Sequence, residues 1–320
     1  MSRKVDMFFY NLRKNALYTL HPLQNFFIEI NTTCNLNCKH CYIPKQFRQS
    51  VLSLEDIEGI LKQIKTDWGN TPGIAITGGE PLLHPSFNEI TKILGRYKFR
   101  WSLATNGLLL TPKIIDSLLE NNCSAITISL DGDENSHEKQ RDKIGSYKEV
   151  LKVIDLLLQK KFPYICITST LHDDNVYSLE NIYTLISKYR DTISWRINPL
   201  LSCENAQQNN LKISKSTYIK ICKFVERVKT DFNTDIILGE KNPLSIKYKE
   251  YLYSEFDSCF AGISTFGVLA NGDIVNCMVC REKTLGNIKD SKSLKSIWDK
   301  QDLTQKGLCE RHIESKQPFK

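Results

Sequence analysis

Three cysteines lie within eight residues of one another near the start of the chain: Cys34, Cys38 and Cys41. They follow an apolar run with the character of a β-strand, in a stretch opened by Asn and Thr turn formers. Such a loop can wrap three thiolates around one metal centre and leave one coordination position open, whereas four would close a zinc or iron–sulfur site. A zinc site completed by His40 is the weaker alternative, because the adjacent residues His40 and Cys41 chelate one ion with difficulty.

Glycines and polar residues also end the next apolar runs of the chain. Two glycines let the backbone approach a ligand closely, and a carboxylate beside them can hold an ammonium group. Polar side chains at the carboxyl ends of neighbouring parallel strands can reach one shared ligand. The residues in these positions are Gly78, Gly79, Glu80, Asn106, Ser129 and Asp131.

The elements that must position these residues are strands that alternate with helices. Apolar β-branched runs predict strands, and apolar residues at three- and four-residue spacing predict helices such as Leu54–Ile64 and Tyr218–Val228. Six strand–helix units indicate an α/β fold with parallel strands, either an open doubly wound sheet or part of a (β/α) barrel. The predicted strands are Phe26–Asn31, Gly73–Thr77, Phe99–Thr105, Ala125–Leu130, Tyr164–Thr170 and Ile193–Pro199.

The three-cysteine motif, in the context TCNLNCKHCY, resembles the signature of radical SAM enzymes. The resemblance covers about residues 25–230 and implies a partial (β/α)6 barrel of the TIM type. It also implies that Cys34, Cys38 and Cys41 hold a [4Fe–4S] cluster whose fourth iron is chelated by S-adenosylmethionine. Reductive cleavage of that sulfonium in the family gives a 5′-deoxyadenosyl radical.

The same resemblance assigns the cofactor-binding residues. It implies that the Gly78-Gly79-Glu80 motif binds the methionyl amine, and that Ser129 and Asp131 reach ribose hydroxyls or the methionyl carboxylate. Arg141 could pair with that carboxylate in a bidentate manner, the alternative being a solvated surface arginine. The expected cofactor-binding set is His40, at a position where the family usually contacts adenine, with Gly78, Gly79, Glu80, Asn106, Ser129, Asp131 and Arg141.

A second group of cysteines lies near the C-terminus, around a hairpin predicted by the Asn271-Gly272 turn. With the LGNI and SIW segments that follow, it resembles the SPASM/twitch extension of radical SAM proteins, which carries auxiliary [4Fe–4S] clusters. We expect one auxiliary cluster, or alternatively a zinc site formed by Cys277, Cys280, Cys309 and His312. The ligands implied by the resemblance are Cys259, Cys277, Cys280 and Cys309.

The domains expected from these patterns are an N-terminal segment, 1–24, a radical SAM core, 25–230, and a small α+β auxiliary domain, 231–320. Cys203 follows the sixth predicted strand on the side where the active site is expected. Its thiol could donate a hydrogen atom to a substrate radical or ligate a cluster, so Cys203 is a candidate catalytic residue.

Composition excludes several classes of protein. The chain has 320 residues with 41% apolar and 25% charged residues, as in ordinary globular proteins. No apolar run is long enough for a membrane span, and the first residues lack the pattern of a signal peptide, so a cytoplasmic location is expected. The net charge of +7 is spread along the chain without a basic, aromatic-interleaved stripe, so no nucleic-acid partner is expected.

The SPASM/twitch resemblance implies an oxidoreductase that modifies a peptide or protein, with or without a leader. A flavodoxin- or ferredoxin-type protein is the expected reductant. The alternatives are a radical SAM dehydrogenase or cyclase acting on a small metabolite, and a non-catalytic iron–sulfur or zinc protein. Glu80, Asp131 and Arg141 argue against the last class, because metal storage needs no pocket for methionine and ribose.

Overall fold

The computed structural model describes residues 20–44, 49–228, 231, 236–238, 261–279, 281–290 and 292–301. Strands of this described part form one sheet in the order β10-β9-β8-β1-β2-β3-β4-β5-β6-β7. They are β1 (Asn25–Glu29), β2 (Gly73–Thr77), β3 (Trp101–Thr105), β4 (Cys123–Ser129), β5 (Ile165–Leu171), β6 (Ile193–Pro199), β7 (Ile236–Leu238), β8 (Thr265–Val268), β9 (Asp273–Val275) and β10 (Thr284–Asn287). The six predicted strands are all present, with ends within two residues of the expected positions.

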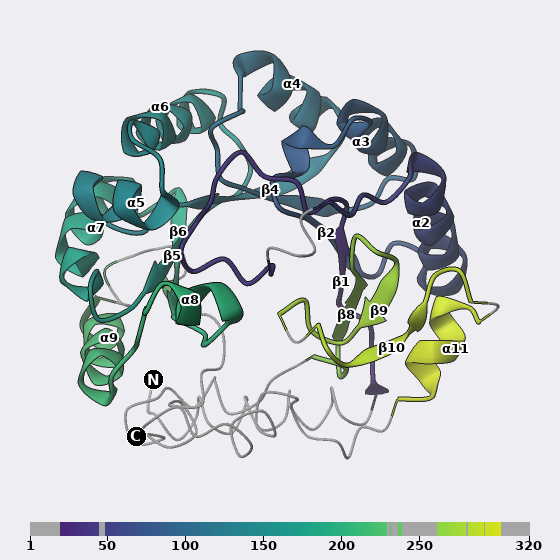
Figure 1. Ribbon diagram of the computed structural model, residues 1–320. Helices are drawn as coiled ribbons and strands as arrows, with labels where there is room; N and C mark the ends of the chain where they lie inside the picture. The colour runs from purple at the N-terminus through teal and green to yellow at the C-terminus, as the bar shows by residue number, and fades with distance from the viewer. Residues whose placement is uncertain are drawn as a thin grey trace.

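The sheet curves around a central space and the helices cover its outer side (Figure 1). This arrangement confirms the predicted α/β partial barrel, and β1 to β7 pair in parallel as crossover connections require. The helices are α2 (Leu54–Trp68), α3 (Phe87–Arg96), α4 (Pro112–Glu120), α5 (Glu134–Arg141), α6 (Ser146–Gln159), α7 (Leu179–Ile186), α8 (Glu204–Gln208), α9 (Lys215–Val228) and α11 (Leu294–Asp299).

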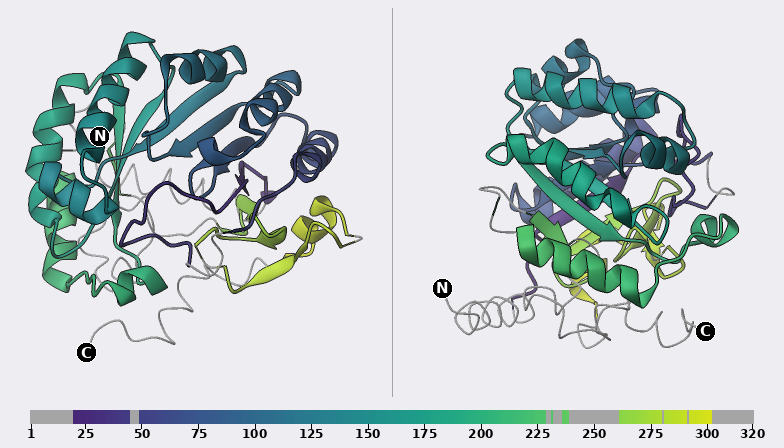
Figure 2. Two further views of the ribbon diagram at one scale, coloured as in Figure 1. Left: turned by 45° about the horizontal axis from the view of Figure 1, so that its top comes forward. Right: turned by 90° about the vertical axis from the view of Figure 1, so that its left-hand side faces the viewer.

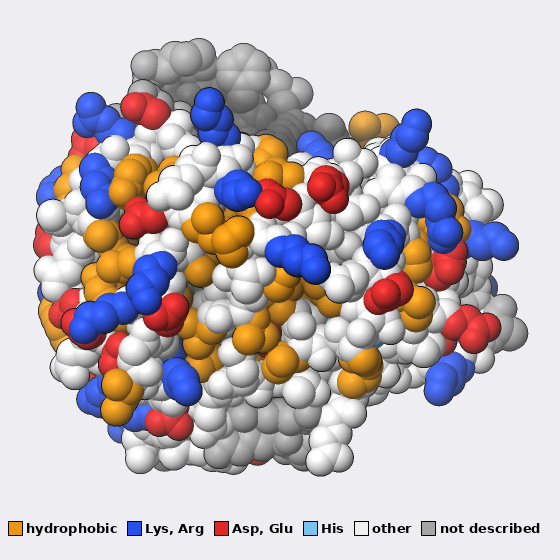
Figure 3. Space-filling model, turned by 90° about the horizontal axis from the view of Figure 1, so that it is seen from above, with side chains coloured by type: hydrophobic (Ala, Val, Ile, Leu, Met, Phe, Trp, Pro, Cys, Tyr) orange, Lys and Arg blue, Asp and Glu red, His pale blue; other side chains and the backbone are white. Residues whose placement is uncertain are grey.

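Local signals explain where these helices begin. The Ser53 hydroxyl accepts the backbone N–H of Asp56, whose carboxylate in turn accepts the Ser53 N–H, so α2 starts with a capping box. Thr111 caps α4, which has Pro112 in its first turn. The outer face mixes charges of both signs with apolar side chains (Figure 3). Within the described residues, no helix is both long and apolar enough to span a membrane.

The two faces of the barrel sheet differ in chemistry. In β2 and β4 the side chains of Ile74, Ile76, Ile126 and Ile128 are buried in the hydrophobic core. The alternate positions on β2 to β6 carry small or polar side chains, unlike the bulky residues that fill a closed barrel. These residues line a central cavity and include Thr77, Ala104, Thr127, Ser129, Thr168, Thr170 and Asn198.

The C-terminal hairpin joins the barrel sheet. β8 pairs in parallel with β1, and the Asn271-Gly272 turn leads into the antiparallel strand β9. Figure 2 shows this hairpin lying against the purple strand β1. At the other edge, β7, a strand that is absent from the six predicted from the sequence, pairs in parallel with β6. Hydrogen bonding therefore crosses the expected boundary between residues 230 and 231, and that boundary stays a prediction.

Candidate functional site

The three-cysteine loop follows β1 and runs across the central space at the carboxyl ends of the strands (Figure 1). Cys34, Cys38 and Cys41 are partly buried and line the same cavity, of about 230 Å³. Side chains and backbone from distant elements hold this loop in place. The Asn205 amide donates to the carbonyl of Cys41 at 2.7 Å, and the Lys39 N–H donates to the carbonyl of Gln140 at 3.0 Å.

The donor set fits an iron–sulfur cluster with an open position. Burial raises the pKa of the Cys34 and Cys38 thiols, and repulsion between neighbouring thiolates raises them further. Such thiols need a cationic centre to be held as thiolates. Within the described residues, no three His, Cys, Asp or Glu side chains converge on a point suited to one metal ion. His40, considered as a zinc ligand, directs Nε2 towards Asp131 Oδ2 at 3.9 Å.

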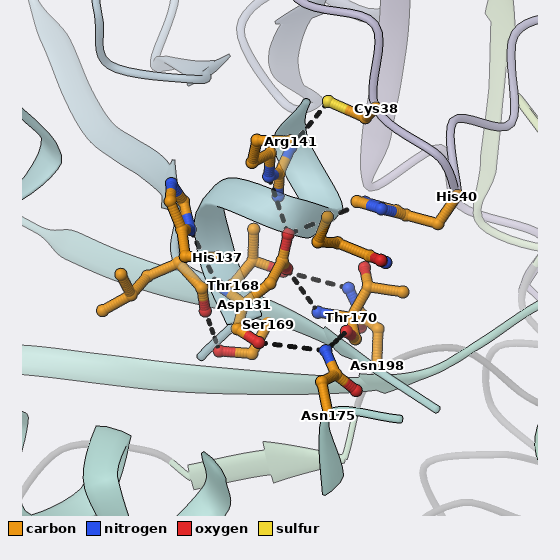
Figure 4. A network of polar contacts seen from close by, with 12 residues as sticks. Cys38, His40, Asp131, His137, Arg141, Thr168, Ser169, Thr170, Asn175 and Asn198 are labelled. Atoms are coloured by element: carbon orange, nitrogen blue, oxygen red, sulfur yellow. Dashed lines mark hydrogen bonds and ion pairs between the residues drawn. The ribbon is translucent and has the colours of Figure 1, made fainter. Parts of the chain in front are cut away.

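Asp131 is the centre of the polar network drawn in Figure 4. Its side chain has no solvent exposure, Oδ1 accepts the N–H of Thr170 at 2.8 Å, and Oδ2 lies 2.7 Å from Arg141 Nε. Burial is the largest influence on Asp131 and raises its pKa, but the Arg141 charge, together with the nearby histidines and the Thr170 N–H, outweighs it, so the pKa is lowered. The backbone N–H of Asp131 also donates to His137 Nδ1 at 3.2 Å.

Arg141 is the last residue of α5 and lies between the carboxylate of Asp131 and the thiol of Cys38. Its Nη1 donates to Cys38 Sγ at 3.6 Å while Nε pairs with Asp131. Burial opposes its charge, but Asp131 and Cys38 together raise its pKa above the usual value. The side chain is 9% exposed and lines the cavity, so it is not the solvated surface arginine considered as the alternative.

The carboxylate of Glu80 is held by hydrogen-bond donors of the protein. It is fully buried and accepts hydrogen bonds from the Thr105 hydroxyl at 2.7 Å and from the backbone N–H groups of Asn106 and Leu82 at 2.9 and 3.2 Å. Burial raises its pKa and these bonds oppose the rise. The same carboxylate caps the 3-10 helix Pro81–Leu83, which follows directly in the chain. A direct contact of this carboxylate with a methionyl amine therefore stays a prediction.

The glycines of this motif pack against the cysteine loop. A Cβ at Gly78 would lie 2.4 Å from Asn31 Oδ1, and one at Gly79 would lie 2.4 Å from the carbonyl oxygen of Thr33. Only glycine permits so close an approach. Both residues line the cavity, so their backbone is available to a ligand there.

Asn106, Ser129 and Cys203 also reach the cavity. The Asn106 amide donates to Asn35 Oδ1 at 2.7 Å, which ties β3 to the cysteine loop. The Cys203 thiol donates to the carbonyls of Cys41 and His40 at 3.4 and 3.5 Å, and burial raises its pKa. The structure thus brings Cys203 to the cluster loop, and its chemical role stays a hypothesis.

The sequence interpretation missed a buried ion pair on the other side of the loop. Glu29 ends β1 with no exposure, and its two oxygens pair with Arg281 Nη1 and Nη2 at 2.6 and 2.7 Å. Glu29 also accepts the N–H of Ala270 at 3.1 Å. A lone carboxylate inside the apolar run FFIEI was the signal, because a buried charge needs a partner. Val279, just before Arg281 in the chain, lines the cavity.

The auxiliary site is only partly visible in the structure. Cys277 is partly buried just after β9. The other expected ligands, Cys259, Cys280 and Cys309, and the alternative ligand His312, lie outside the described residues. The ligand set of this site therefore stays a prediction.

Two protein-family models match the chain. The radical SAM superfamily matches residues 28–186, and an iron–sulfur cluster-binding domain, SPASM, matches residues 259–318. A radical SAM domain implies an S-adenosylmethionine-binding [4Fe–4S] cluster, and the cysteine loop described above fits that group. A SPASM domain implies an auxiliary iron–sulfur cluster. The match therefore favours such a cluster at the C-terminal site over the zinc site considered as the alternative.

Similar proteins differ in how much of their length is shared. The AdoMet-dependent heme synthase of Methanosarcina barkeri is 22% identical over 88% of this chain and 87% of its own. The radical SAM cyclopropyl synthase TigE of Paramaledivibacter caminithermalis is 28% identical over 51% of this chain and 38% of its own. SuiB of Streptococcus suis, bound to S-adenosylmethionine, shares the fold with a TM-score of 0.70 at 16% identity, over 87% of this chain and 66% of SuiB.

Proposed function

The chain belongs to the radical SAM superfamily and carries a C-terminal SPASM domain, and from this premise we propose that it is an enzyme that modifies a peptide or protein. When bound, the cluster and S-adenosylmethionine supply a 5′-deoxyadenosyl radical that abstracts hydrogen from a substrate. Cys34, Cys38 and Cys41 would hold the cluster. Gly78, Gly79, Asn106, Ser129 and Arg141 would surround S-adenosylmethionine, and this assignment is part of the proposal.

The observation that carries the proposal is the charge of the cavity wall. Among the described residues that line the cavity, Arg141 is the sole Lys or Arg, and Asp and Glu are absent. Arg141 is itself neutralised by Asp131. The remaining wall offers hydroxyls and amides, such as those of Thr168, Thr170 and Asn198, which suit the N–H and C=O groups of a peptide segment.

Similarity to SuiB supports the same proposal. SuiB has also been solved bound to a precursor peptide, SuiA, and that structure aligns with 95% of this chain at a TM-score of 0.69. By analogy, the substrate of this chain would be a peptide, with or without a leader. A flavodoxin- or ferredoxin-type protein remains the proposed reductant. Both partners are proposals that rest on the family.

A small-molecule substrate is the second candidate, because the heme synthase similarity extends over nearly the whole of both chains. A tetrapyrrole carries several carboxylates, and binding it requires several cationic side chains. Among the described residues, the cavity wall offers one Lys or Arg, and it is already paired with a carboxylate. The wall therefore favours the peptide.

The test compares substrates on the reconstituted protein. We expect 5′-deoxyadenosine release to be stimulated by peptides encoded beside the gene, with a mass change in the peptide, and not by tetrapyrroles. Replacing Thr168 with Val should raise the KM for the peptide, while the matched exposed variant Thr66→Val should not. Stimulation by tetrapyrroles alone would establish the second candidate and overturn the first.

A further inference from the structure

Arg141 connects the carboxylate of Asp131 to the sulfur of Cys38, and this bridge has a consequence for electron transfer. We propose that Arg141 is a positioning residue that donates a hydrogen bond to the Cys38 thiolate and raises the reduction potential of the S-adenosylmethionine-binding cluster. The proposal concerns the cluster alone and does not depend on which substrate the enzyme modifies.

The first step is that Asp131 is fixed on several sides. Its Oδ1 accepts the N–H of Thr170, and its backbone carbonyl accepts the Asn175 amide at 2.9 Å (Figure 4). The same Asn175 amide donates to the carbonyl of Thr170 at 2.9 Å. His137 accepts the Asp131 N–H. A carboxylate with these contacts cannot rotate freely, so it presents Oδ2 in one direction.

The second step is that this direction sets the place of Arg141. Nε lies 2.7 Å from Asp131 Oδ2, and Nη1 lies 3.6 Å from Cys38 Sγ. The guanidinium is planar and rigid, so fixing Nε at the carboxylate also fixes Nη1 at the sulfur. Gln140, the preceding residue of α5, is itself held by His172 Nε2 at 3.0 Å. The end of α5 is thus anchored beside the cysteine loop.

The third step is electrostatic. Reduction adds one negative charge to the cluster, and a cation with a hydrogen-bond donor at a ligand sulfur stabilises that charge. Arg141 and Asp131 are both buried, so solvent screens this effect little. The guanidinium and its carboxylate sum to no net charge, and the nearer member of the pair on the cluster side is the arginine. Removing one member leaves the charge of the other beside the cluster.

The test is a potentiometric titration followed by electron paramagnetic resonance on the reconstituted full chain, without substrate. The cluster in question is the one whose spectrum changes when S-adenosylmethionine is added. Arg141→Gln should lower its potential, and Asp131→Asn should raise it. We expect at least a tenfold change in the ratio of reduced to oxidised cluster at a fixed potential, which is about 59 mV for a one-electron couple.

Two further variants separate this role from a purely structural one. The double variant Arg141→Gln with Asp131→Asn restores local neutrality and should lie between the two single variants. Lys139→Gln removes an exposed cation from the same helix and should leave the potential unchanged. If Arg141→Gln loses iron at this site, Arg141→Lys replaces it; this variant keeps the charge but loses the planar donor, so its cluster potential should be lower than that of the wild type. Shifts of the same sign in both single variants, or none beyond that of Lys139→Gln, would overturn the proposal.

Discussion

Two buried carboxylate–arginine pairs flank the cysteine loop, and they join different parts of the molecule. Asp131–Arg141 links the end of β4 to the end of α5, and its arginine touches Cys38. Glu29–Arg281 links the end of β1 to the C-terminal segment, 252 residues away in the chain. The first pair therefore contacts the cysteine loop within the barrel, whereas the second attaches the SPASM region to the barrel.

The two pairs are buried to the same extent. Both carboxylates have no exposure, and the arginine side chains are 9% and 10% exposed. Removing one partner takes away the opposite charge from a buried ionised side chain in either case, at a cost of about 3–5 kcal/mol. The free energy of unfolding will therefore change similarly for both pairs. The two pairs differ in which region of the molecule is destabilised when the pair is broken.

The largest expected effect comes from the loop between the pairs. Replacing Cys34, Cys38 and Cys41 with Ala should remove the S-adenosylmethionine-binding cluster and abolish S-adenosylmethionine cleavage. Iron analysis should then fall from about eight to about four atoms per chain, the difference being one cubane cluster. Cys203→Ala is the matched control, because its thiol lines the same cavity. Loss of iron in that control would instead make Cys203 a cluster ligand.

The next largest effect comes from removing the carboxylate of either pair, which shows which region each pair stabilises. Glu29→Ala should destabilise the protein by about 3–5 kcal/mol, because the buried charge of Arg281 loses both of its hydrogen bonds to this carboxylate. Hydrogen exchange should become faster in β8 and β9, since Glu29 also accepts the N–H of Ala270 beside them. Asp131→Ala should instead speed exchange around β4 and β5. Equal exchange profiles in the two variants would contradict the division of roles.

Sequence patterns predicted the barrel side of this comparison better than the C-terminal side. The six strands and the caps at Ser53 and Thr111 depend on local periodicity and turn chemistry, which a sequence displays directly. The pairing of β8 with β1 joins residues far apart in the chain. No local pattern carries that information. β7 has three residues, too few for a periodic signal.

The candidate site shows the same limit. The spacing of Cys34, Cys38 and Cys41 is a local motif and predicted one shared loop correctly. The direction of a side chain is not determined by a local motif. The Glu80 carboxylate accepts hydrogen bonds both from the 3-10 helix that follows it and from Thr105 on β3, 25 residues along the chain. The ion pair of Glu29 was missed: the carboxylate within the apolar run FFIEI signals that a partner is needed, but no local pattern identifies that partner as Arg281.

Acid should lower the stability of the region around Asp131, through protonation of His137. His137 contacts the Asp131 backbone, and burial lowers its pKa from 6.5 to about 4. Between these values the unfolded chain binds a proton that the folded chain does not, so stability is complete above pH 6.5 and falls as the pH drops. The loss attributable to His137 reaches about 3 kcal/mol near pH 4.

Urea unfolding of the apoprotein at pH 7, 6 and 5 measures this slope, with His137→Gln as the comparison. Gln can still accept the Asp131 N–H but does not titrate. The variant should therefore lose part of the acid sensitivity, while the remainder should persist through the other histidines whose pKa burial lowers, which are His21, His40, His84 and His172. An unchanged slope in the variant would show that His137 is protonated with little cost to the fold.

The smallest expected effect comes from an ion pair of the same chemistry on the surface. Lys160 Nζ lies 2.6 and 2.8 Å from the Asp116 oxygens, but the two side chains are 34% and 47% exposed. Water hydrates both charges in the folded and unfolded states, so Lys160→Gln should cost less than about 1 kcal/mol, and about 1 M salt should abolish the difference. Urea unfolding at low and high salt measures it beside Glu29→Ala. A similar loss of stability in the two variants would mean that burial does not increase the contribution of the Glu29–Arg281 and Asp131–Arg141 pairs to stability. The two buried pairs would then differ only in the residues that they contact.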